Sequence, residues 1–167
     1  MIRITAFERE LTRLLPETER LLRAANLSVH LRVTQVTLHG SRGLRGGFRP
    51  DSDIDLSLLV RTGQMPIGPV LDRLLREVVE TALENWESSV EPDLAAVFDL
   101  RECGLKCFCV STFDEPLCTN GGADCFGLYK IQSGFKGFVP PVGLDIRKLY
   151  PCLMNWQRPA NGDLSAA

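Results

Sequence analysis

The chain has 167 residues, of which 44% are hydrophobic and 24% are charged, and its formal net charge is −2. This length and composition are typical of one soluble globular domain with a substantial core. The slight negative charge gives no electrostatic reason to expect duplex nucleic acid as the main partner. No apolar run approaches the length of a membrane span, and charges interrupt the N-terminus where a secretory signal needs an apolar segment. We therefore expect a cytoplasmic protein.

The first predicted elements are a helix and a strand. Leucine and phenylalanine recur at helical spacing from residue 4 to residue 25, with Glu and Arg between them, which predicts an amphipathic helix packed on a sheet. Residues 30–38, HLRVTQVTL, alternate and are rich in β-branched residues. They predict a central strand. On one face this strand would carry Leu31, Val33, Gln35 and Thr37.

The stretch from Thr37 to Val60 carries the chemistry. After the first strand, Gly40 allows close approach of the backbone, and Ser41 can open a helix whose first N–H groups point at phosphate. A second strand over 52–60 then places Asp53 and Asp55 on one face. Two adjacent carboxylates repel each other, and a divalent cation with a preference for hard oxygen ligands relieves that repulsion.

These residues resemble the nucleotide-binding signature of the DNA polymerase β-like nucleotidyltransferase superfamily, in particular its minimal nucleotidyltransferase branch. The signature is a strand, Gly-Ser, a short helix, and Ser-Asp-x-Asp-apolar on a second strand. Eleven residues lie between Ser41 and Asp53, one more than in many members. The matching positions are Gly40, Ser41, Ser52, Asp53, Asp55 and Leu56.

The loop between the two halves of the signature contains three glycines and three arginines, Arg42, Arg45 and Arg49. The planar guanidinium pairs well with phosphate oxygens, so Arg45 and Arg49 join Gly40, Ser41 and Ser52 as candidate nucleotide-binding residues. Exposed loops also favour arginine and glycine for their own sake, and the pattern does not identify which arginine contacts phosphate.

A helix over 70–86 follows, and then a strand over 90–100, as in a crossover between strands of one sheet. The resemblance implies a third carboxylate on this strand, with Glu91, Asp93 and Asp99 as candidates. Asp93 directly precedes an apolar run, whereas Asp99 lies six residues, or roughly 20 Å, further along an extended chain. We expect Asp93 to complete the site. The alternative is that Asp93 is a surface turn residue.

The C-terminal part lies beyond the resemblance. Residues 113–158 are rich in glycine and proline and predict a loop-rich extension packed on a core of residues 1–112, with a short strand at Leu128–Ile131, a short helix near 144–149, and a flexible tail at 159–167. Lys130 and Lys136 lie in a segment that is a lip over the nucleotide pocket or an irregular cover for the sheet. The cysteines form either a structural Zn²⁺ or iron–sulfur site or, by default, buried free thiols. They are Cys103, Cys107, Cys109, Cys118, Cys125 and Cys152.

The sequence therefore predicts an α/β (α+β) domain with a mixed central sheet flanked by helices. The resemblance implies the nucleotidyltransferase fold and Mg²⁺-dependent transfer of a nucleoside monophosphate from a nucleoside triphosphate to an acceptor hydroxyl. Asp53, Asp55 and Asp93 would be the catalytic and metal-binding residues for two Mg²⁺ ions. The acceptor would be a small molecule or a protein, such as a helical toxin partner. The alternative is a non-catalytic nucleotide- or partner-binding module of the same fold, antitoxin-like or sensing.

Overall fold

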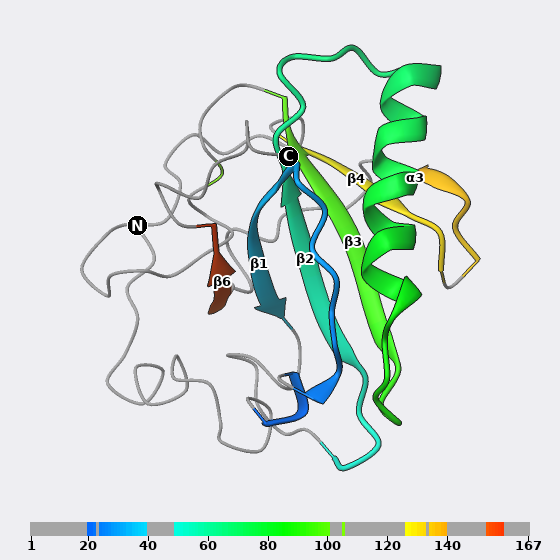
Figure 1. The fold of residues 1–167 in the computed structure, drawn as a ribbon. Coiled ribbons are helices and arrows are strands. Elements are labelled where there is room, and N and C mark those ends of the chain that lie inside the picture. The colour runs from blue at the N-terminus through cyan, green and yellow to red at the C-terminus, as the bar shows by residue number, and fades with distance from the viewer. Residues whose placement is uncertain are drawn as a thin grey trace, which may run out of the picture.

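The computed structural model describes residues 20–22, 24–39, 49–100, 105, 126–132, 134–139 and 153–158. The predicted helix up to residue 19, Gly40, Ser41, Arg42, Arg45, all six cysteines, the helix near 144–149 and the tail lie outside these residues. The elements, shown in Figure 1, are β1 (Val33–His39), β2 (Ile54–Val60), α3 (Pro69–Glu84), β3 (Pro92–Asp99), β4 (Phe126–Lys130), β5 (Gly137–Val139) and β6 (Leu153–Gln157).

The strands form a six-stranded sheet in the order β5-β4-β3-β2-β1-β6. β2 and β3 pair in parallel, and every other neighbouring pair is antiparallel. Parallel neighbours need a crossover connection, which α3 supplies between β2 and β3. The prediction of a mixed central sheet is confirmed, and the fold class is α+β with one main helix in the described residues.

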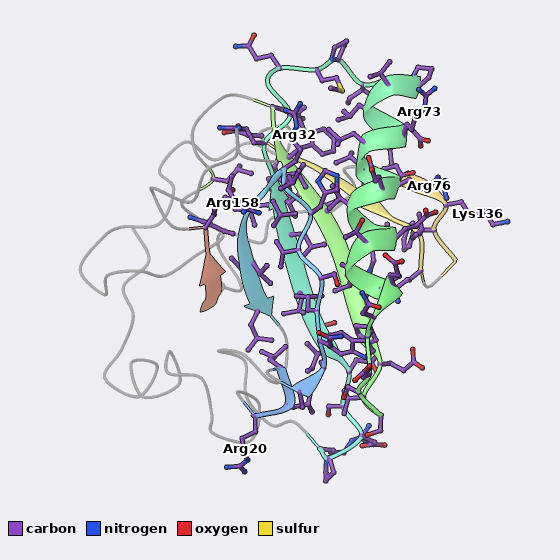
Figure 2. The ribbon with its side chains drawn as sticks, in the orientation of Figure 1. Arg20, Arg32, Arg73, Arg76, Lys136 and Arg158 are labelled. Carbon is purple, nitrogen blue, oxygen red and sulfur yellow. The ribbon has the colours of Figure 1, made fainter. Side chains whose placement is uncertain are left out.

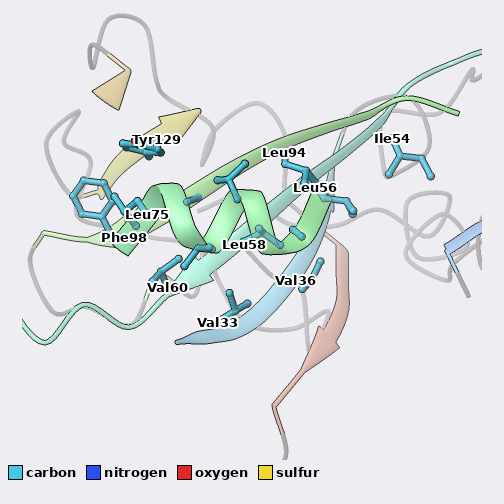
Figure 3. Close-up of a cluster of buried hydrophobic side chains, with 14 of the residues drawn as sticks. Val33, Val36, Ile54, Leu56, Leu58, Val60, Leu75, Leu94, Phe98 and Tyr129 are labelled. Atoms are coloured by element: carbon cyan, nitrogen blue, oxygen red, sulfur yellow. The ribbon is translucent and has the colours of Figure 1, made fainter. Parts of the chain in front are cut away.

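Helix α3 confirms the helix predicted over 70–86. Proline stands in its first turn, where the missing N–H has no intrahelical partner to lose. Figure 1 shows this helix lying along one face of the sheet. Its buried residues, Leu71, Leu75, Val78, Val79 and Ala82, pack in the main core, where Figure 3 labels Leu75. None of the helices in the described residues has both the length and the apolar character that crossing a membrane requires.

The two central strands bury apolar side chains on both faces. In β2, Ile54, Leu56 and Leu58 face α3 and join the main core (Figure 3). Leu59 points the other way and packs in a second, smaller cluster with Val97 of β3. Parallel strands with both faces covered are expected to contain such nearly continuous apolar runs.

Strand β1 corrects one prediction. Simple alternation would place Leu31, Val33, Gln35 and Thr37 on one face, but Val36 and Leu38 are the residues that join Val33 in the main core. The pairing of β1 with β2 shifts register between Val33 and Gln35. A bulge of this kind inserts one residue and reverses the faces beyond it. Leu31 precedes the strand and is 47% exposed.

The segment 113–158 contributes strands to the sheet. The strand predicted at Leu128–Ile131 is observed as β4, which pairs with β3, whereas β5 and β6 were not predicted. Phe138 of β5 makes edge-to-face contacts with Phe98 and Tyr129, whose ring centroids lie 6.0 and 5.2 Å away. β6 pairs with β1 at the opposite edge. Within the described residues, this segment therefore extends the sheet on both sides.

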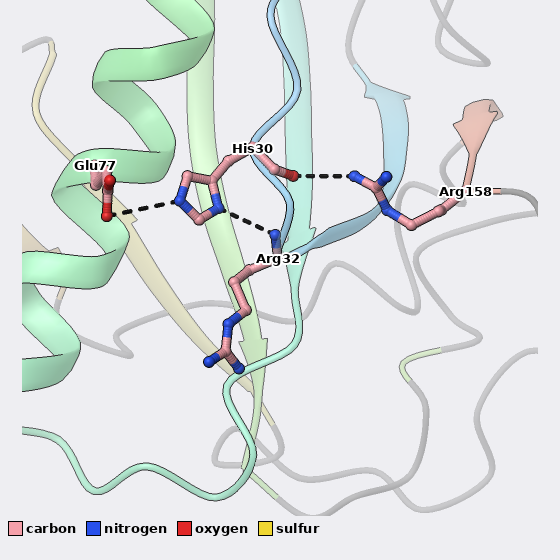
Figure 4. Close-up of polar contacts among 4 residues, drawn as sticks. All are labelled: His30, Arg32, Glu77 and Arg158. Atoms are coloured by element: carbon pink, nitrogen blue, oxygen red, sulfur yellow. Dashed lines mark hydrogen bonds and ion pairs between the residues drawn. The ribbon is translucent and has the colours of Figure 1, made fainter. Parts of the chain in front are cut away.

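Polar contacts around His30 tie the start of β1 to its surroundings (Figure 4). The imidazole Nε2 lies 3.6 Å from Glu77 of α3, and Nδ1 accepts a hydrogen bond from the backbone N–H of Arg32. Arg158, which follows β6, donates to the carbonyl oxygens of His30 and Val33. These contacts connect β1 to the helix and to the outer strand.

Candidate functional site

Asp55 and Asp93 occupy matching positions on the parallel pair. Each is the second residue of its strand, and the two lie directly opposite each other in the register of β2 and β3. The residues on either side, Ile54, Leu56 and Leu94 among them, are buried in the main core, on the face of the sheet that α3 covers. Because side chains alternate along a strand, both carboxylates must point to the face away from α3. Both are half-buried there.

The environment of Asp55 disfavours a negative charge. Burial raises the pKa of Asp55 from 3.8 to about 6, with further increases from the neighbouring Asp93 and Asp53 and a smaller opposing effect from Lys130. Removal of water and the presence of like charge both make a second carboxylate costly to ionise. A positive charge beside the two carboxylates, such as that of Lys130, therefore reduces the cost of ionising Asp55.

The side chain of Lys130, the last residue of β4, reaches Asp93. Its ammonium Nζ lies 2.7 Å from Oδ1 of Asp93, and the Lys130 side chain is only 16% exposed. The same Oδ1 is enclosed and receives no hydrogen bond of good geometry, so the contact is an ion pair without an aligned hydrogen bond. The sequence placed Lys130 in a lip or a cover. The feature of the sequence that could have placed Lys130 is the alternation in FGLYK. There Phe126, Leu128 and Lys130 share one face of a strand, and the last of them is a cation.

Gln132 fixes the backbone around Asp93. Its side-chain amide donates to the carbonyl of Pro92 at 3.0 Å, and its oxygen accepts from the N–H of Leu94 at 3.0 Å. The ladder between β3 and β4 pairs residues 96–99 with 126–129, so the Gln132 side chain takes over where β4 has left the sheet. No sequence pattern indicated this role, which depends on the pairing of β4 with β3.

The turn that leads into β2 is held by Ser52. Its hydroxyl accepts a hydrogen bond from the N–H of Arg49 at 2.7 Å, and its own N–H donates to the Arg49 carbonyl at 2.9 Å. Ser52 therefore supports the turn that precedes Asp53. The exposed guanidinium of Arg49 lies 3.5 Å from Asp51. Contact of Arg49 or Ser52 with a nucleotide stays a prediction.

The structure brings together two of the three predicted carboxylates. Asp53 is exposed just before β2, and only its charge acts on Asp55. Glu91 is exposed before β3, and Asp99 lies at the opposite end of β3 from Asp93. Among the residues that the structure describes, no three His, Cys, Asp or Glu side chains converge closely enough to hold one ion.

Two observations nonetheless fit a divalent cation at Asp55 and Asp93. The donors are hard carboxylate oxygens on one face, which is the chemistry that Mg²⁺ prefers. In addition, Oδ1 of Asp93 is an enclosed acceptor that receives no aligned hydrogen bond and is accompanied by a cation, the Lys130 ammonium at 2.7 Å. The β1 residue in register with Asp55 is His39, which extends the row of paired positions to a third strand.

A separate cavity of about 390 Å³ lies at the opposite ends of β2 and β3. Thr62 and Phe98 line it at the strand ends, with Met65 and Ile67 from the loop before α3. None of the carboxylates of the candidate site borders this cavity. It therefore contributes nothing to the chemistry at Asp55 and Asp93.

Comparison of the chain with protein-family models, with curated proteins and with solved structures gave no match. The features that bear on function are therefore the geometry of Asp55, Asp93 and Lys130 and the sequence around them.

Proposed function

We propose that this protein is a Mg²⁺-dependent nucleotidyltransferase that moves a nucleoside monophosphate group from a nucleoside triphosphate to an acceptor hydroxyl. The observation that carries the proposal is the register of β2 and β3, which sets Asp55 directly opposite Asp93 on one face. The signature residues Gly40, Ser41, Ser52 and Asp53 supply the remaining support from sequence. The acceptor is a protein or small-molecule hydroxyl.

The carboxylates would act as metal ligands. Asp53 and Asp55 would hold the Mg²⁺ that accompanies the triphosphate, and Asp93 would join them for a second ion. When bound, Mg²⁺ would neutralise the phosphate oxygens and favour deprotonation of the acceptor hydroxyl. The raised pKa of Asp55 supports this assignment, because a carboxylate that resists ionisation alone gains most from a nearby cation.

The residues around the carboxylates would keep them in place. Asp55 and Asp93 lie on neighbouring strands of the sheet, and Gln132 holds the backbone on both sides of Asp93. Ser52 fixes the turn that precedes Asp53. A site on rigid elements holds reacting groups in a defined geometry, which is the main contribution that a protein makes to phosphoryl-type transfer.

The first experiment measures nucleotide-dependent stability and transfer together. Mg²⁺ with ATP at 100 times its dissociation constant should add about 2.7 kcal/mol to the free energy of unfolding. Asp53→Asn combined with Asp55→Asn should abolish this gain, whereas Asp51→Asn, an exposed acidic position of the same stretch, should leave it intact. Transfer is followed by label from an α-³²P triphosphate appearing on copurifying acceptors.

Asp93 separates the two candidate functions. The non-catalytic binding module is favoured by one observation: Lys130 already neutralises Asp93. In the enzyme, Asp93→Asn should stop transfer while much of the nucleotide affinity remains. Wild-type protein that binds nucleotide but labels nothing, with Asp93→Asn identical to it, would establish the binding module. A thermal gain that survives the double variant would contradict the metal assignment for both.

A further inference from the structure

Lys130 is placed by the strand that carries it. Along β4, Phe126 and Leu128 point to the face away from α3 and join the second apolar cluster, while Tyr129 joins the main core. Lys130 follows in alternation, so its stem runs along the same face toward Asp93. An ammonium with 16% exposure is costly unless an opposite charge accompanies it, and here the Asp93 carboxylate does so.

We infer that Lys130 is a built-in counterion that occupies the cation position at Asp93 in the absence of metal, and that a metal ion binds there only when Lys130 is displaced. This inference rests on the proposed assignment of Asp93 as a metal ligand. Both cations would use the same enclosed oxygen, Oδ1, which an ammonium at 2.7 Å already contacts.

Displacement of Lys130 leaves the carboxylate where it is. Gln132 holds the backbone at Pro92 and Leu94 through its own hydrogen bonds, independently of the ammonium. Asp93 also stays in the ladder with Asp55. The two roles are therefore divided between two residues: Gln132 positions the carboxylate, and Lys130 neutralises it.

Lys130 also has a second favourable neighbour. Its Nζ lies 5.6 Å from the centroid of the Phe135 ring, within the range of a cation–π interaction. Phe135 belongs to the connection between β4 and β5 and is partly exposed. The four-carbon stem can pivot about the end of β4 so that the ammonium leaves Asp93 while staying near this ring.

The consequence is a penalty on metal affinity. When a site can accept its ligand only part of the time, the apparent affinity equals the intrinsic affinity multiplied by the fraction of time that the site is free. A metal ion that arrives alone must break the ion pair, so the apparent affinity of the free ion is reduced. Removing the ammonium while keeping an apolar stem should remove the penalty.

The experiment measures Mn²⁺ binding to the full chain by electron paramagnetic resonance, without nucleotide. Lys130→Met should bind Mn²⁺ at least ten times more tightly than the wild type. Lys136→Met serves as the matched control, because it removes one positive charge from the same hairpin at an exposed position directed away from the sheet (Figure 2). Its Mn²⁺ affinity should stay within about twofold of wild type.

Lys130→Arg provides the opposite test and keeps the experiment decisive if the methionine variant does not fold. A guanidinium is always charged and pairs with carboxylates through two donors, so this variant should bind Mn²⁺ no more tightly than wild type, and by the competition argument more weakly. Circular dichroism during heating checks that each variant is folded.

The outcomes separate this inference from the proposed function. Equal or weaker Mn²⁺ binding by folded Lys130→Met, or tighter binding by Lys130→Arg, overturns the counterion role. Absence of Mn²⁺ binding in wild type and all variants overturns both the counterion role and the metal assignment. Tighter binding by Lys130→Met without any nucleotidyl transfer supports the counterion and overturns only the enzymatic function.

Discussion

The two faces of the β2–β3 pair differ in what their side chains do. On the face toward α3, Ile54, Leu58 and Leu94 are all fully or almost fully buried, and the core is apolar along the whole length of the strands. On the other face, the same strands begin with Asp55 and Asp93 and become apolar only further along, at Leu59 and Val97. One pair of strands therefore serves as core on one side and carries a charged site on the other.

This difference shows how the fold tolerates the carboxylates. Two aspartates buried in an apolar core would reduce the free energy of unfolding by several kcal/mol unless a positive charge accompanied them. Here Asp55 and Asp93 are each the second residue of a strand and are half-buried. Lys130 lies beside Asp93. Burial of apolar side chains on the α3 face stabilises the fold. The other face can therefore retain the repulsion between the Asp55 and Asp93 carboxylates.

The largest expected effect comes from the apolar face. Leu58 and Leu59 are neighbours in β2 that point to opposite faces, so they form a matched pair. Leu58→Ala should reduce the free energy of unfolding by about 3–5 kcal/mol, because it opens a cavity under α3, and Leu59→Ala by about 2 kcal/mol, because its cluster is smaller. Urea unfolding measures both. Equal losses would contradict the assignment of α3's face as the main core.

A second expected effect concerns the close contact between β3 and β4. Gly127 lies opposite Phe98 in the ladder, and a Cβ added to Gly127 would collide with the Phe98 ring. Gly127→Ala should therefore destabilise the protein by about 1–3 kcal/mol, since the ring must move within a packed core. The control is Gly134→Ala. Open space surrounds a Cβ added there, so any loss of stability comes from the positive φ of 84° and not from a collision. Phe98→Leu combined with Gly127→Ala should recover part of the loss, and additivity of the two changes would contradict the collision.

The smallest expected effect tests the charged face. Asp55 has a folded-state pKa of about 6 against 3.8, so between these values the folded protein holds a proton that the unfolded chain has released. Stability from this group is thus lost as pH rises from about 4 to about 6. Without metal, Asp55→Asn should become more stable than wild type across that window, by about 1 kcal/mol after allowance for solvent screening.

Urea unfolding at pH 4, 5, 6 and 7.5 with a chelator measures the difference between Asp55→Asn and wild type. Asp51→Asn is the control, because the Asp51 carboxylate is exposed and its ionisation has no cost of burial. A difference that does not change with pH would show that Asp55 is not disfavoured in its ionised form.

The parts of this fold that the sequence predicted are those with a strong local period. The runs 52–60, 70–86 and 90–100 contain alternating or helical apolar spacing, and each is observed within a few residues. The expectation that Asp93 lies near Asp55 came from the family resemblance, and the observed parallel register of β2 and β3 sets the two residues opposite each other. Local pattern was enough for the elements, whereas the pairing of the two carboxylates was expected from the resemblance.

The remaining features depend on long-range pairing. The bulge in β1 changed which residues face the core, and nothing in HLRVTQVTL marks its place. The contact of Lys130 with Asp93 and the clamp by Gln132 required β4 to pair with β3, across a segment of weak periodicity. Short strands such as β5 and β6 are determined by their partners more than by their own composition.

The parallel pairing of β2 and β3 also has a kinetic consequence. Asp55 and Asp93 are separated in the chain by the whole of α3 and both of its connections. Bringing them together therefore costs the chain the entropy of closing this long loop. Hairpins form in microseconds, whereas parallel pairs that enclose a helix form later along the folding route. During synthesis the two carboxylates therefore meet only after β3 has left the ribosome. A nascent chain that stops before β3 contains Asp53 and Asp55 without Asp93.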